Sequence, residues 1–406
     1  MKPMGPIPPH FAGRETLTIA GQDAEHWIAE AGDTPLFVYD MGEVRARLAR
    51  LRAAMPARLD IHYAIKANPH PGVLAAIAPL VDGFDLASGG ELVEALKVKD
   101  ASVVSFAGPG KRDDELELAI DTGATLNLES EGEARRALAI GERLGRRPRL
   151  AVRVNPDFDL KGSGMKMGGR ASPFGVDAAR VPALVRELIA AGADWRGFHI
   201  YAGSQALSAA AIIETQAATV ALARRLSDES GAAAPHVNLG GGFGIPYFAG
   251  DTPVDIEAVG AALAETLDRD GAADTQYAIE LGRWMVGECG VYLTRVVDVK
   301  ESQGERFVVV DGGMHHQLAA SGNFGTVVRR NYPIAVAGRM TGELAEVSVV
   351  GSLCTPLDRL GDKVGLPPVE VGGVIAVFLA GAYGFTASPG LFLGHPAARE
   401  LVVGLD

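Results

Sequence analysis

The sequence is poor in cysteine, has no excess of basic residues and has no long uninterrupted apolar run. Its two cysteines, Cys289 and Cys354, cannot build the disulfide framework of a small secreted domain, so we expect free thiols in a reducing compartment. The formal net charge of −12 disfavours a nucleic-acid or anionic-membrane partner. Residues 1–15 lack the apolar segment of a secretory signal. The most apolar stretch, residues 372–385, is interrupted by glycines and is shorter than the run of about 20 apolar residues that a membrane helix needs. We therefore expect a cytoplasmic protein.

Glycine is abundant instead. The chain has 51 glycines among 406 residues, well above the usual share of about 7%. Hydrophobic residues make up 48% of the chain, so the glycines do not belong to a low-complexity segment. The fold must therefore contain many backbone positions that only glycine tolerates well.

Short β-rich runs alternate with amphipathic helical patterns from about residue 35, which is typical of βα units around a parallel sheet. Helical patterns fall at residues 43–54, 91–97, 114–122, 131–144, 181–191, 209–230 and 256–269. After an opening strand at 36–39, candidate strands cover residues 61–65, 83–87, 103–107, 125–128, 150–154, 197–201, 236–239 and 276–281. Eight such strands predict an α/β fold of the (β/α)8 barrel type, whose usual size is about 250 residues. An open doubly wound sheet is the alternative.

The pattern changes after about residue 289. Strand-like runs at 291–299, 307–310, 345–350, 374–379 and 401–403 follow one another without long helices, which indicates a second, mostly β domain. We predict an N-terminal arm at 1–34, the barrel at 35–285 and the β domain at 286–406. The strand at 36–39 precedes the eight barrel strands, so we expect it to pair with the β domain.

Unusual polar residues stand at the carboxyl ends of the predicted barrel strands, where such barrels carry their active sites. Lys66 follows the first strand. It could simply extend to solvent, or a lowered pKa could let it form a Schiff base with a carbonyl cofactor. Asp85, Arg153 and His199 end the second, fifth and sixth strands, and Ser204 follows shortly after.

Strand seven runs into a glycine loop, Gly240–Gly244, in which only Phe243 is not glycine. Free backbone N–H groups in such a loop can bind an anion, and this barrel commonly binds phosphate near strands seven and eight. A flexible turn is the simpler interpretation. Strand eight ends in Glu280, Leu281, Gly282 and Arg283. Glu280 could pair with Arg283, or its carboxylate could keep a pyridine nitrogen protonated.

These segments together resemble the fold-type III pyridoxal-phosphate decarboxylases, which include diaminopimelate and ornithine decarboxylases. The resemblance follows the order of the chain from about residue 35 to 392 through residues 63–68, 199–205, 240–244, 280–283, Cys354 and 381–383. It implies pyridoxal 5'-phosphate as cofactor. It also implies an alanine-racemase-like barrel with a β second domain.

The resemblance also implies roles for single residues. Lys66 would carry the cofactor as a Schiff base, His199 would stack on its ring, and Glu280 would face the pyridine nitrogen. Asp85 and Arg153 would support the ring and its phenolic oxygen. The phosphate would be surrounded by Ser204, Gly240, Gly241, Gly242 and Arg283, and closed in by Tyr383. Gly282 would also belong to the cofactor site.

Cys354 would donate the proton that replaces CO₂, and the resemblance implies that it does so in the active site of a neighbouring subunit. The expected assembly is therefore a homodimer with shared active sites. From the residues alone, an inert buried thiol is the alternative, and Cys289 keeps that interpretation.

The residues after Cys354 bear on the substrate. The diaminopimelate and ornithine enzymes have an acidic residue directly after this cysteine, whereas this chain has Thr355. Segments 165–170 and 314–325 resemble a divergent subgroup that includes a decarboxylase of butirosin biosynthesis, acting on a glutamyl unit on an acyl carrier protein, and exosortase-associated decarboxylases. The resemblance thus implies an amino-acid decarboxylase with a substrate that could be tethered to a carrier. Alternatives are a free diamino-acid decarboxylase, an amino-acid racemase and a cofactor-binding regulatory homologue without activity.

An acidic carrier would need a local basic patch on this acidic chain. The candidate residues, which could equally be ordinary solvated charges, are Lys161, Lys166, Arg170, Arg329 and Arg330. His315 and His316 could suggest a metal. Adjacent histidines on a strand would point to opposite faces, however, so we expect no metal.

Overall fold

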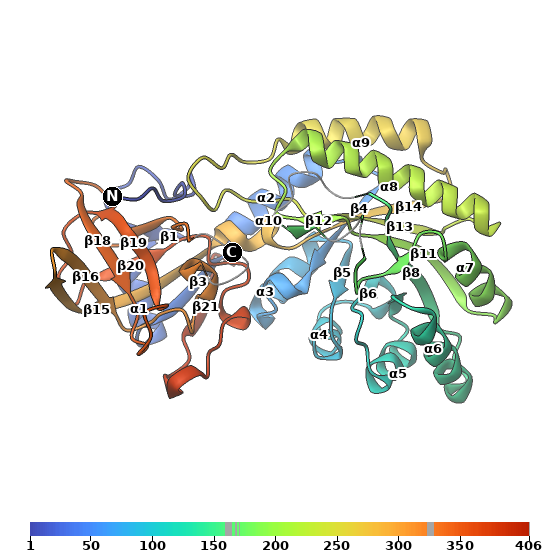
Figure 1. Cartoon of the computed structure of the whole chain (residues 1–406), viewed down its shortest axis with the longest axis horizontal. Coiled ribbons are helices and arrows are strands. Elements are labelled where there is room, and N and C mark those ends of the chain that lie inside the picture. The colour runs from blue at the N-terminus through green and yellow to red at the C-terminus, as the bar shows by residue number, and fades with distance from the viewer. Residues whose placement is uncertain (159–164, 167–168, 170, 323–328, 406) are drawn as a thin grey trace. The chain divides into compact units, whose positions relative to one another are not determined.

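The computed structural model describes residues 1–158, 165–166, 169, 171–322 and 329–405. The chain forms two compact units (Figure 1). The barrel unit comprises Arg47–Gly244 and Pro253–Gly282, and the β unit comprises Met1–Ala46, Ile245–Thr252 and Arg283–Asp406.

The barrel unit is a closed ring of eight parallel strands. Neighbouring strands follow the order β8, β11, β13, β14, β4, β5, β6 and β7, and a β7–β8 pairing closes the ring. The ring strands are β4 (Leu59–Ala64), β5 (Gly83–Leu86), β6 (Val104–Phe106), β7 (Thr125–Leu128), β8 (Arg149–Asn155), β11 (Asp194–Ile200), β13 (His236–Gly241) and β14 (Gln276–Leu281). The (β/α)8 prediction is confirmed, and the open sheet is wrong. Two-residue strands β9 (Met165–Lys166), β10 (Val176–Asp177) and β12 (Gly203–Ser204) add to these.

Helices alternate with the strands along the chain. They are α2 (Met41–Ala54), which starts in the β unit, α3 (Pro71–Ile77), α4 (Gly89–Ala95), α5 (Asp113–Thr122), α6 (Glu131–Leu144), α7 (Val181–Ala190), α8 (Ala209–Ser230) and α9 (Ile256–Asp270). Local sequence sets several of their limits. Ser208 accepts a hydrogen bond from the Ala211 N–H at the start of α8, and Gly231 ends that helix with a left-handed φ of 69°.

The β unit contains an eight-stranded sheet and two short strands. Strand β3 pairs antiparallel with β15 and parallel with β21, so an N-terminal strand lies inside this sheet. The sheet strands are β3 (Leu36–Asp40), β15 (Gly290–Ser302), β16 (Glu305–Val310), β17 (Ile334–Val336), β18 (Ala345–Val350), β19 (Arg359–Leu366), β20 (Val374–Val377) and β21 (Arg399–Val403). The unit also holds β1 (Thr18–Ile19), β2 (Gln22–Asp23), α1 (Ala24–Ala31) and α10 (Arg283–Val286).

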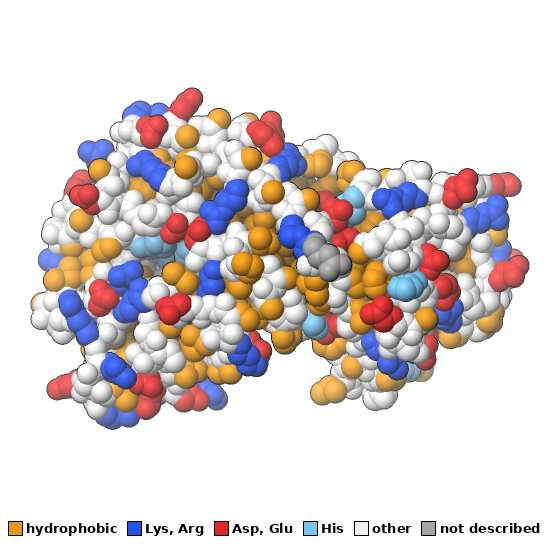
Figure 2. Space-filling model, turned by 180° about the vertical axis from the view of Figure 1, so that it is seen from behind, with side chains coloured by type: hydrophobic (Ala, Val, Ile, Leu, Met, Phe, Trp, Pro, Cys, Tyr) orange, Lys and Arg blue, Asp and Glu red, His pale blue; other side chains and the backbone are white. Residues whose placement is uncertain are grey.

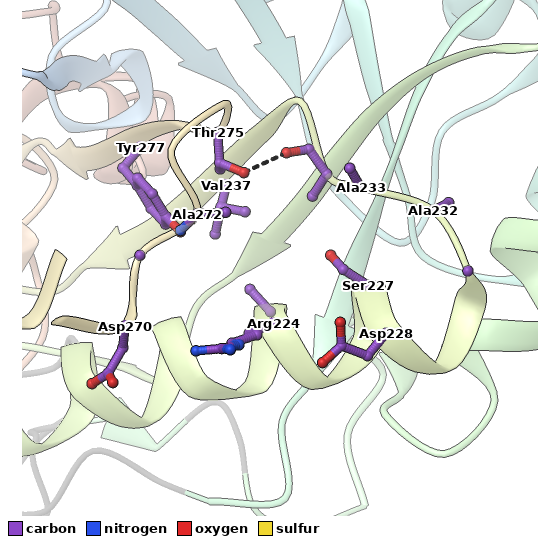
Figure 3. A pocket seen from close by; sticks show the side chains of 14 residues that line it. Arg224, Ser227, Asp228, Ala232, Ala233, Val237, Asp270, Ala272, Thr275 and Tyr277 are labelled. Carbon is purple, nitrogen blue, oxygen red and sulfur yellow. Dashed lines mark hydrogen bonds between the residues drawn. The ribbon is translucent and has the colours of Figure 1, made fainter. Parts of the chain in front are cut away.

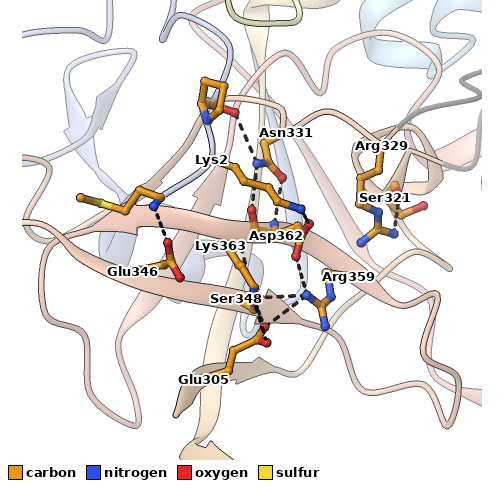
Figure 4. Close-up of polar contacts among 12 residues, drawn as sticks. Lys2, Glu305, Ser321, Arg329, Asn331, Glu346, Ser348, Arg359, Asp362 and Lys363 are labelled. Carbon is orange, nitrogen blue, oxygen red and sulfur yellow. Dashed lines mark hydrogen bonds and ion pairs between the residues drawn. The ribbon is translucent and has the colours of Figure 1, made fainter. Parts of the chain in front are cut away.

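The first residues of the chain are fixed on the β unit by polar contacts (Figure 4). Lys2 Nζ lies 2.5 Å from Asp362, and the Asn331 side chain donates to the carbonyls of Pro3 and Asp362. Asp362 in turn pairs with Arg359 on β19. These contacts order a segment that has turns and one isolated bridge rather than a helix or strand through Arg14. Among the described residues, no helix is long and apolar enough to cross a membrane.

Candidate active site

Polar side chains fill much of the interior of the barrel, where such a fold ordinarily packs apolar layers. Their positions follow from the register, which sets His62 beside Glu280 and His199 beside both Arg153 and Asn238. The buried polar residues of the ring strands are His62, Asp85, Asn127, Arg153, Asn155, His199, Asn238 and Glu280. Buried polar groups need hydrogen-bond partners, so this set defines a network rather than a passive core.

Glu280 is the centre of this network. The His199 Nε2–H donates to its Oε2 atom over 2.8 Å, and the Asn238 Nδ2–H donates to the same oxygen over 3.1 Å. Burial alone would raise the pKa of Glu280, but His199 holds that pKa well below its usual value. The charges of Lys66 and Arg153 lower it further. Glu280 is therefore a buried carboxylate that remains ionised at neutral pH.

Lys66 lies at the carboxyl end of the first barrel strand. Strand β4 ends at Ala64, and Lys66 belongs to the single turn of 3-10 helix that follows, Ile65–Ala67. Its side chain is exposed, and Nζ lies 5.7 Å from the centre of the Tyr201 ring. Its charge also acts on Glu91. Burial raises the pKa of Glu91, and this effect outweighs the lowering by the Ala87 N–H hydrogen bond and by the charge of Lys66. The predicted lysine thus stands among acidic groups of the barrel mouth.

Arg153 is held in place by Glu129. Its Nη1 donates to Glu129 Oε1 over 2.7 Å, and its guanidinium lies 5.0 Å from the centre of the Phe174 ring. Burial alone would raise the pKa of Glu129, yet the charge and hydrogen bond of Arg153 lower it. Glu129 also accepts backbone N–H bonds from Gly108 and Gly175. Arg153 therefore presents a fixed positive charge inside the barrel.

The glycine loop is packed so closely that side chains cannot replace its hydrogens. A Cβ at Gly241 would lie 1.8 Å from the Glu280 carbonyl oxygen, and one at Gly242 would lie 2.0 Å from the Gly203 carbonyl oxygen. Gly240 and Gly242 also have left-handed φ values of 69° and 78°. The loop is therefore a built feature and not merely a flexible turn. Glycine is therefore required where this loop packs against the neighbouring backbone.

Asn238 joins the loop to the carboxylates. Its Oδ1 accepts from the Gly240 N–H over 2.8 Å, and its Nδ2 reaches Asp85 at 3.4 Å as well as Glu280. Ser204 is buried and belongs to the two-residue strand β12, which pairs with β9. The preceding residue, Gly203, is the one whose carbonyl lies against Gly242 of the loop. Beside Glu280, the Nδ1 atom of His199 is buried and has no partner among the described residues. A ligand with a ring nitrogen and a phosphate fits a site with an ionised carboxylate, an imidazole and a glycine cradle.

Arg283 and Tyr383 form a cluster of their own within the β unit. The Arg283 guanidinium lies 4.8 Å from the ring centre of Tyr383 and 5.4 Å from that of Tyr247. Burial raises the pKa of Tyr247, although Arg283 opposes this. Tyr383 has a left-handed φ of 54°, and such strain in a residue with a side chain is commonly kept for a functional reason. Gly282, the last residue of the barrel unit, directly precedes Arg283.

The two cysteines have different surroundings. Cys289 is buried, as expected for an inert thiol, whereas Cys354 is exposed, so the buried interpretation of Cys354 is wrong. The turn that carries Cys354 is fixed by Asp358, whose two carboxylate oxygens accept from the N–H groups of Leu353 and Met314. Burial raises the pKa of Asp358 despite these hydrogen bonds.

The expectation of a strand at His315 and His316 is wrong, because both residues lie in a turn. Their rings are 3.8 Å apart, and the ring of His395 lies 5.2 Å from that of His315. Of the basic candidates for a carrier surface, Lys161 and Arg170 lie outside the described residues, and for Lys166 the structure describes only the backbone. Arg329 donates to the Ser321 and Leu357 carbonyls, and Arg330 stacks on Phe248.

A separate cavity of about 530 Å³ lies on the barrel unit near the C-terminal end of α8 (Figure 3). Arg224, Ser227 and Asp228 line it from α8, while Thr275 and Tyr277 line it from the β14 side. None of the site residues predicted from sequence lines this cavity. The cavity is therefore not part of the network around Glu280.

Sequence reasoning missed three members of the site: Asn238, Glu129 and His62. Asn238 and His62 each lie between two buried apolar residues of a strand, and Asn is disfavoured in strands. A polar residue at such a position, flanked by buried apolar neighbours, was a signal that could have found both. Glu129 follows the short strand β7 and carries no comparable local signal.

A parallel α/β barrel with a lysine, an ionised carboxylate and a glycine loop among its strand ends matches what is expected of pyridoxal-phosphate enzymes built on this fold. Residues 41–287 match the family model described as pyridoxal-dependent decarboxylase, pyridoxal binding domain. The chain belongs to the family of fold-type III pyridoxal-phosphate-dependent decarboxylases, as the resemblance implied. It is a decarboxylase of amino acids with pyridoxal 5'-phosphate as cofactor.

Curated relatives cover nearly the whole chain. An L-glutamyl-[BtrI acyl-carrier protein] decarboxylase of Niallia circulans is 35% identical over 91% of this chain and 89% of the relative. A diaminopimelate decarboxylase of Methanothermobacter thermautotrophicus is 31% identical over 95% and 90%. The crystal structure of diaminopimelate decarboxylase from Helicobacter pylori complexed with L-lysine superposes with a TM-score of 0.83 at 27% identity, covering 93% of this chain and 94% of the other. These comparisons confirm the expected barrel with a mostly β second domain.

Proposed function

We propose that this enzyme removes the α-carboxylate of an amino-acid substrate with Lys66 holding the cofactor through its ε-amine and Cys354 returning a proton to the same carbon. Bound pyridoxal phosphate supplies an electron sink for the carbanion left when CO₂ departs. The observation that carries the proposal is the buried Glu280 carboxylate, which His199 and Asn238 hold by hydrogen bonds of 2.8 and 3.1 Å.

Each residue then has a distinct task. Glu280 would keep a proton on the ring nitrogen, because an ionised carboxylate in a buried site favours a positive charge beside it. His199 would cover one face of the ring, with Asp85 and Arg153 as supporting charges. The phosphate would be bound by Ser204, Gly240, Gly241, Gly242, Arg283 and Tyr383, and Gly282 would also belong to the cofactor site. Residues 35–285 would thus supply most of the cofactor site, and residues 286–406 the rest.

Cys354 would act as the acid for the α-carbon. Its thiol is exposed, as a group that must reach a substrate has to be. A thiol titrates near working pH, which suits a proton donor. The proposal places this thiol in the active site of a second subunit, so the active form is a homodimer with shared sites. Full activity of a monomer at low concentration would contradict the shared site.

We propose an amino acid tethered to an acyl carrier protein as the substrate. The Niallia circulans relative is named for such a substrate, and Cys354 is not followed by the acidic residue of the diamino-acid enzymes. On the face drawn in Figure 2, acidic and basic side chains are interspersed rather than gathered by sign. A carrier would therefore have to bind through a local set of basic side chains, and Arg329 and Arg330 are the candidates whose side chains the structure describes. A free diamino acid remains the second candidate, because diaminopimelate decarboxylases are also relatives.

Release of CO₂ from four substrate classes tests the proposal: free α-amino acids, free diamino acids, N-acylated amino acids and aminoacyl groups on a carrier protein. We expect release from the carrier-bound substrate to exceed release from the same amino acid free in solution. Release only from diaminopimelate or another diamino acid would favour the second candidate. Epimerisation without CO₂ would indicate a racemase, and cofactor binding without turnover of any class would indicate a regulatory homologue. The Lys66→Ala variant is the negative control.

A further inference from the structure

Three metal-ligating side chains gather at the opposite end of the barrel from Lys66. Asp60 and His62 lie near the start of β4, and His236 is the first residue of β13. One ligand atom from each residue lies within 4.8 Å of those of the other two. The decarboxylation proposed above assigns no chemical step to these residues, although His62 belongs to the buried network around Glu280. The rings of His62 and His236 face each other, with centres 5.7 Å apart and planes 24° from parallel.

The orientation of His62 is already fixed by a carboxylate. Its Nδ1–H donates to Asp85 Oδ2 over 3.1 Å, which leaves Nε2 as the nitrogen that can offer a lone pair. Metal-binding histidines almost always donate their other N–H to a carboxylate or carbonyl in this manner. A histidine held in this tautomer by a buried carboxylate is therefore prepared as a ligand rather than only as a core residue.

A cavity gives this cluster room for further ligands. It has a volume of about 400 Å³, and Asp60, His62 and His236 all line it. Water can therefore complete a coordination shell, since a water needs far less space than this. Asp82 and Arg196 also line the cavity, but each has a partner of its own, Arg52 at 2.5 Å and Asp194 at 3.9 Å.

We propose that Asp60, His62 and His236 bind a divalent transition-metal ion of the Zn²⁺ class at the amino-terminal end of the barrel. Two imidazoles and one carboxylate are a donor set that Zn²⁺ accepts, with water in the fourth position. Bonds of about 2.0–2.2 Å in a tetrahedron place ligand atoms about 3.4 Å apart. The ligand atoms therefore need to approach one another by at most about 1.4 Å, which rotation about their side-chain bonds can supply.

The site is coupled to the cofactor end through buried side chains. His62 is bonded to Asp85, Asn238 reaches both Asp85 and Glu280, and Glu280 is bonded to His199. A metal on His62 Nε2 keeps its Nδ1–H pointed at Asp85. The ion would thus hold one end of the network that positions Glu280.

Isothermal titration of the metal-stripped, cofactor-loaded enzyme with ZnSO₄ tests the proposal. We expect one saturable Zn²⁺ site per chain and no comparable binding of Mg²⁺, which prefers oxygen ligands. Loss of an outer-shell partner commonly weakens metal binding about 10–100-fold, so loss of a ligand in His236→Gln or Asp60→Asn should weaken it at least as much. No saturable Zn²⁺ binding, or the wild-type affinity in His236→Gln, would overturn the proposal.

Two controls separate this site from other histidines. His26→Gln changes an exposed histidine, and His315→Gln changes the histidine cluster of the β unit. Both variants should keep the wild-type Zn²⁺ affinity. A measurement that needs no variant is the anomalous difference map of Zn²⁺-soaked crystals of the wild-type enzyme. A peak between Asp60 and His236 supports the site, and a peak only at His315 contradicts it.

Discussion

Replacing Glu280 with glutamine removes the charge of this side chain while nearly keeping its shape. In the native barrel the His199 and Asn238 N–H groups both point at Glu280 Oε2. A glutamine has one acceptor oxygen and one NH₂ group, so it loses the charge that strengthens both hydrogen bonds. We expect Glu280→Gln to fold and to retain the cofactor, because the glycine loop and Lys66 are unchanged.

The expected loss of activity follows from the energy of one charge-assisted hydrogen bond. Such a bond contributes about 1.5–3 kcal/mol, and a neutral amide opposite the ring nitrogen loses most of it. Since each 1.36 kcal/mol in barrier height is tenfold in rate, kcat should fall about 10- to 100-fold. Because the pKa of Glu280 is held below its usual value, the wild-type carboxylate is ionised throughout the neutral pH range, and this difference should persist there.

The assay is steady-state CO₂ release, with the bound cofactor measured by its visible absorbance in the same samples. Asp362→Asn is the matched control, because Asp362 is a buried carboxylate of the β unit that pairs with Lys2 at 2.5 Å. It should lower the free energy of unfolding and leave kcat per cofactor-loaded enzyme unchanged. An unchanged kcat in Glu280→Gln, with cofactor bound, would refute the role assigned to this carboxylate.

Three further changes test other parts of the account. Cys354→Ala should keep the cofactor absorbance while kcat falls about 10²–10⁴-fold, the usual contribution of a general acid; an unchanged rate would exclude the thiol. Gly241→Ala places a Cβ 1.8 Å from the Glu280 carbonyl and should cost at least about 1–3 kcal/mol of stability in urea unfolding, whereas Gly338→Ala, with no atom within 4 Å, should be nearly neutral. Burial and neighbouring histidines lower the pKa of His315 to about 4. The unfolded chain therefore binds this proton more readily, and the free energy of unfolding should fall by at most about 3 kcal/mol as pH drops from 6.5 to 4. His315→Phe should remove that part of the pH dependence, and an identical slope would contradict it.

The barrel was predictable because its strands combine β-branched residues with regular helical spacers. The strand expected at 125–128 has the observed limits of β7, and the helix expected at 209–230 has those of α8. Helix α3 was missed because seven residues are too few for a helical period to stand out. Strand β19 was missed because its sequence, RLGDKVGL, contains glycines and charges that disfavour a strand. Its pairing with β18 overrides that local preference.

The candidate site residues could be selected from the sequence where a predicted strand ends in a charged residue or runs into a glycine cluster. Lys66, Glu280 and the glycine loop carry such a signal in the sequence itself. The connections between them were not predictable, since the Asn238 bridge to Asp85 and Glu280 depends on which strands are neighbours in the ring. The strand expected at His315 and His316 was wrong, because these residues lie in a turn. An apolar-polar pattern of a few residues does not distinguish a strand from a buried turn.

Borohydride reduction of the cofactor-loaded enzyme, followed by proteolysis and mass spectrometry, tests the central claim most directly. We expect the reduced cofactor to be covalently attached to Lys66, in the peptide that follows β4. Stoichiometric attachment to another lysine, or cofactor that remains fully removable after reduction, would contradict it.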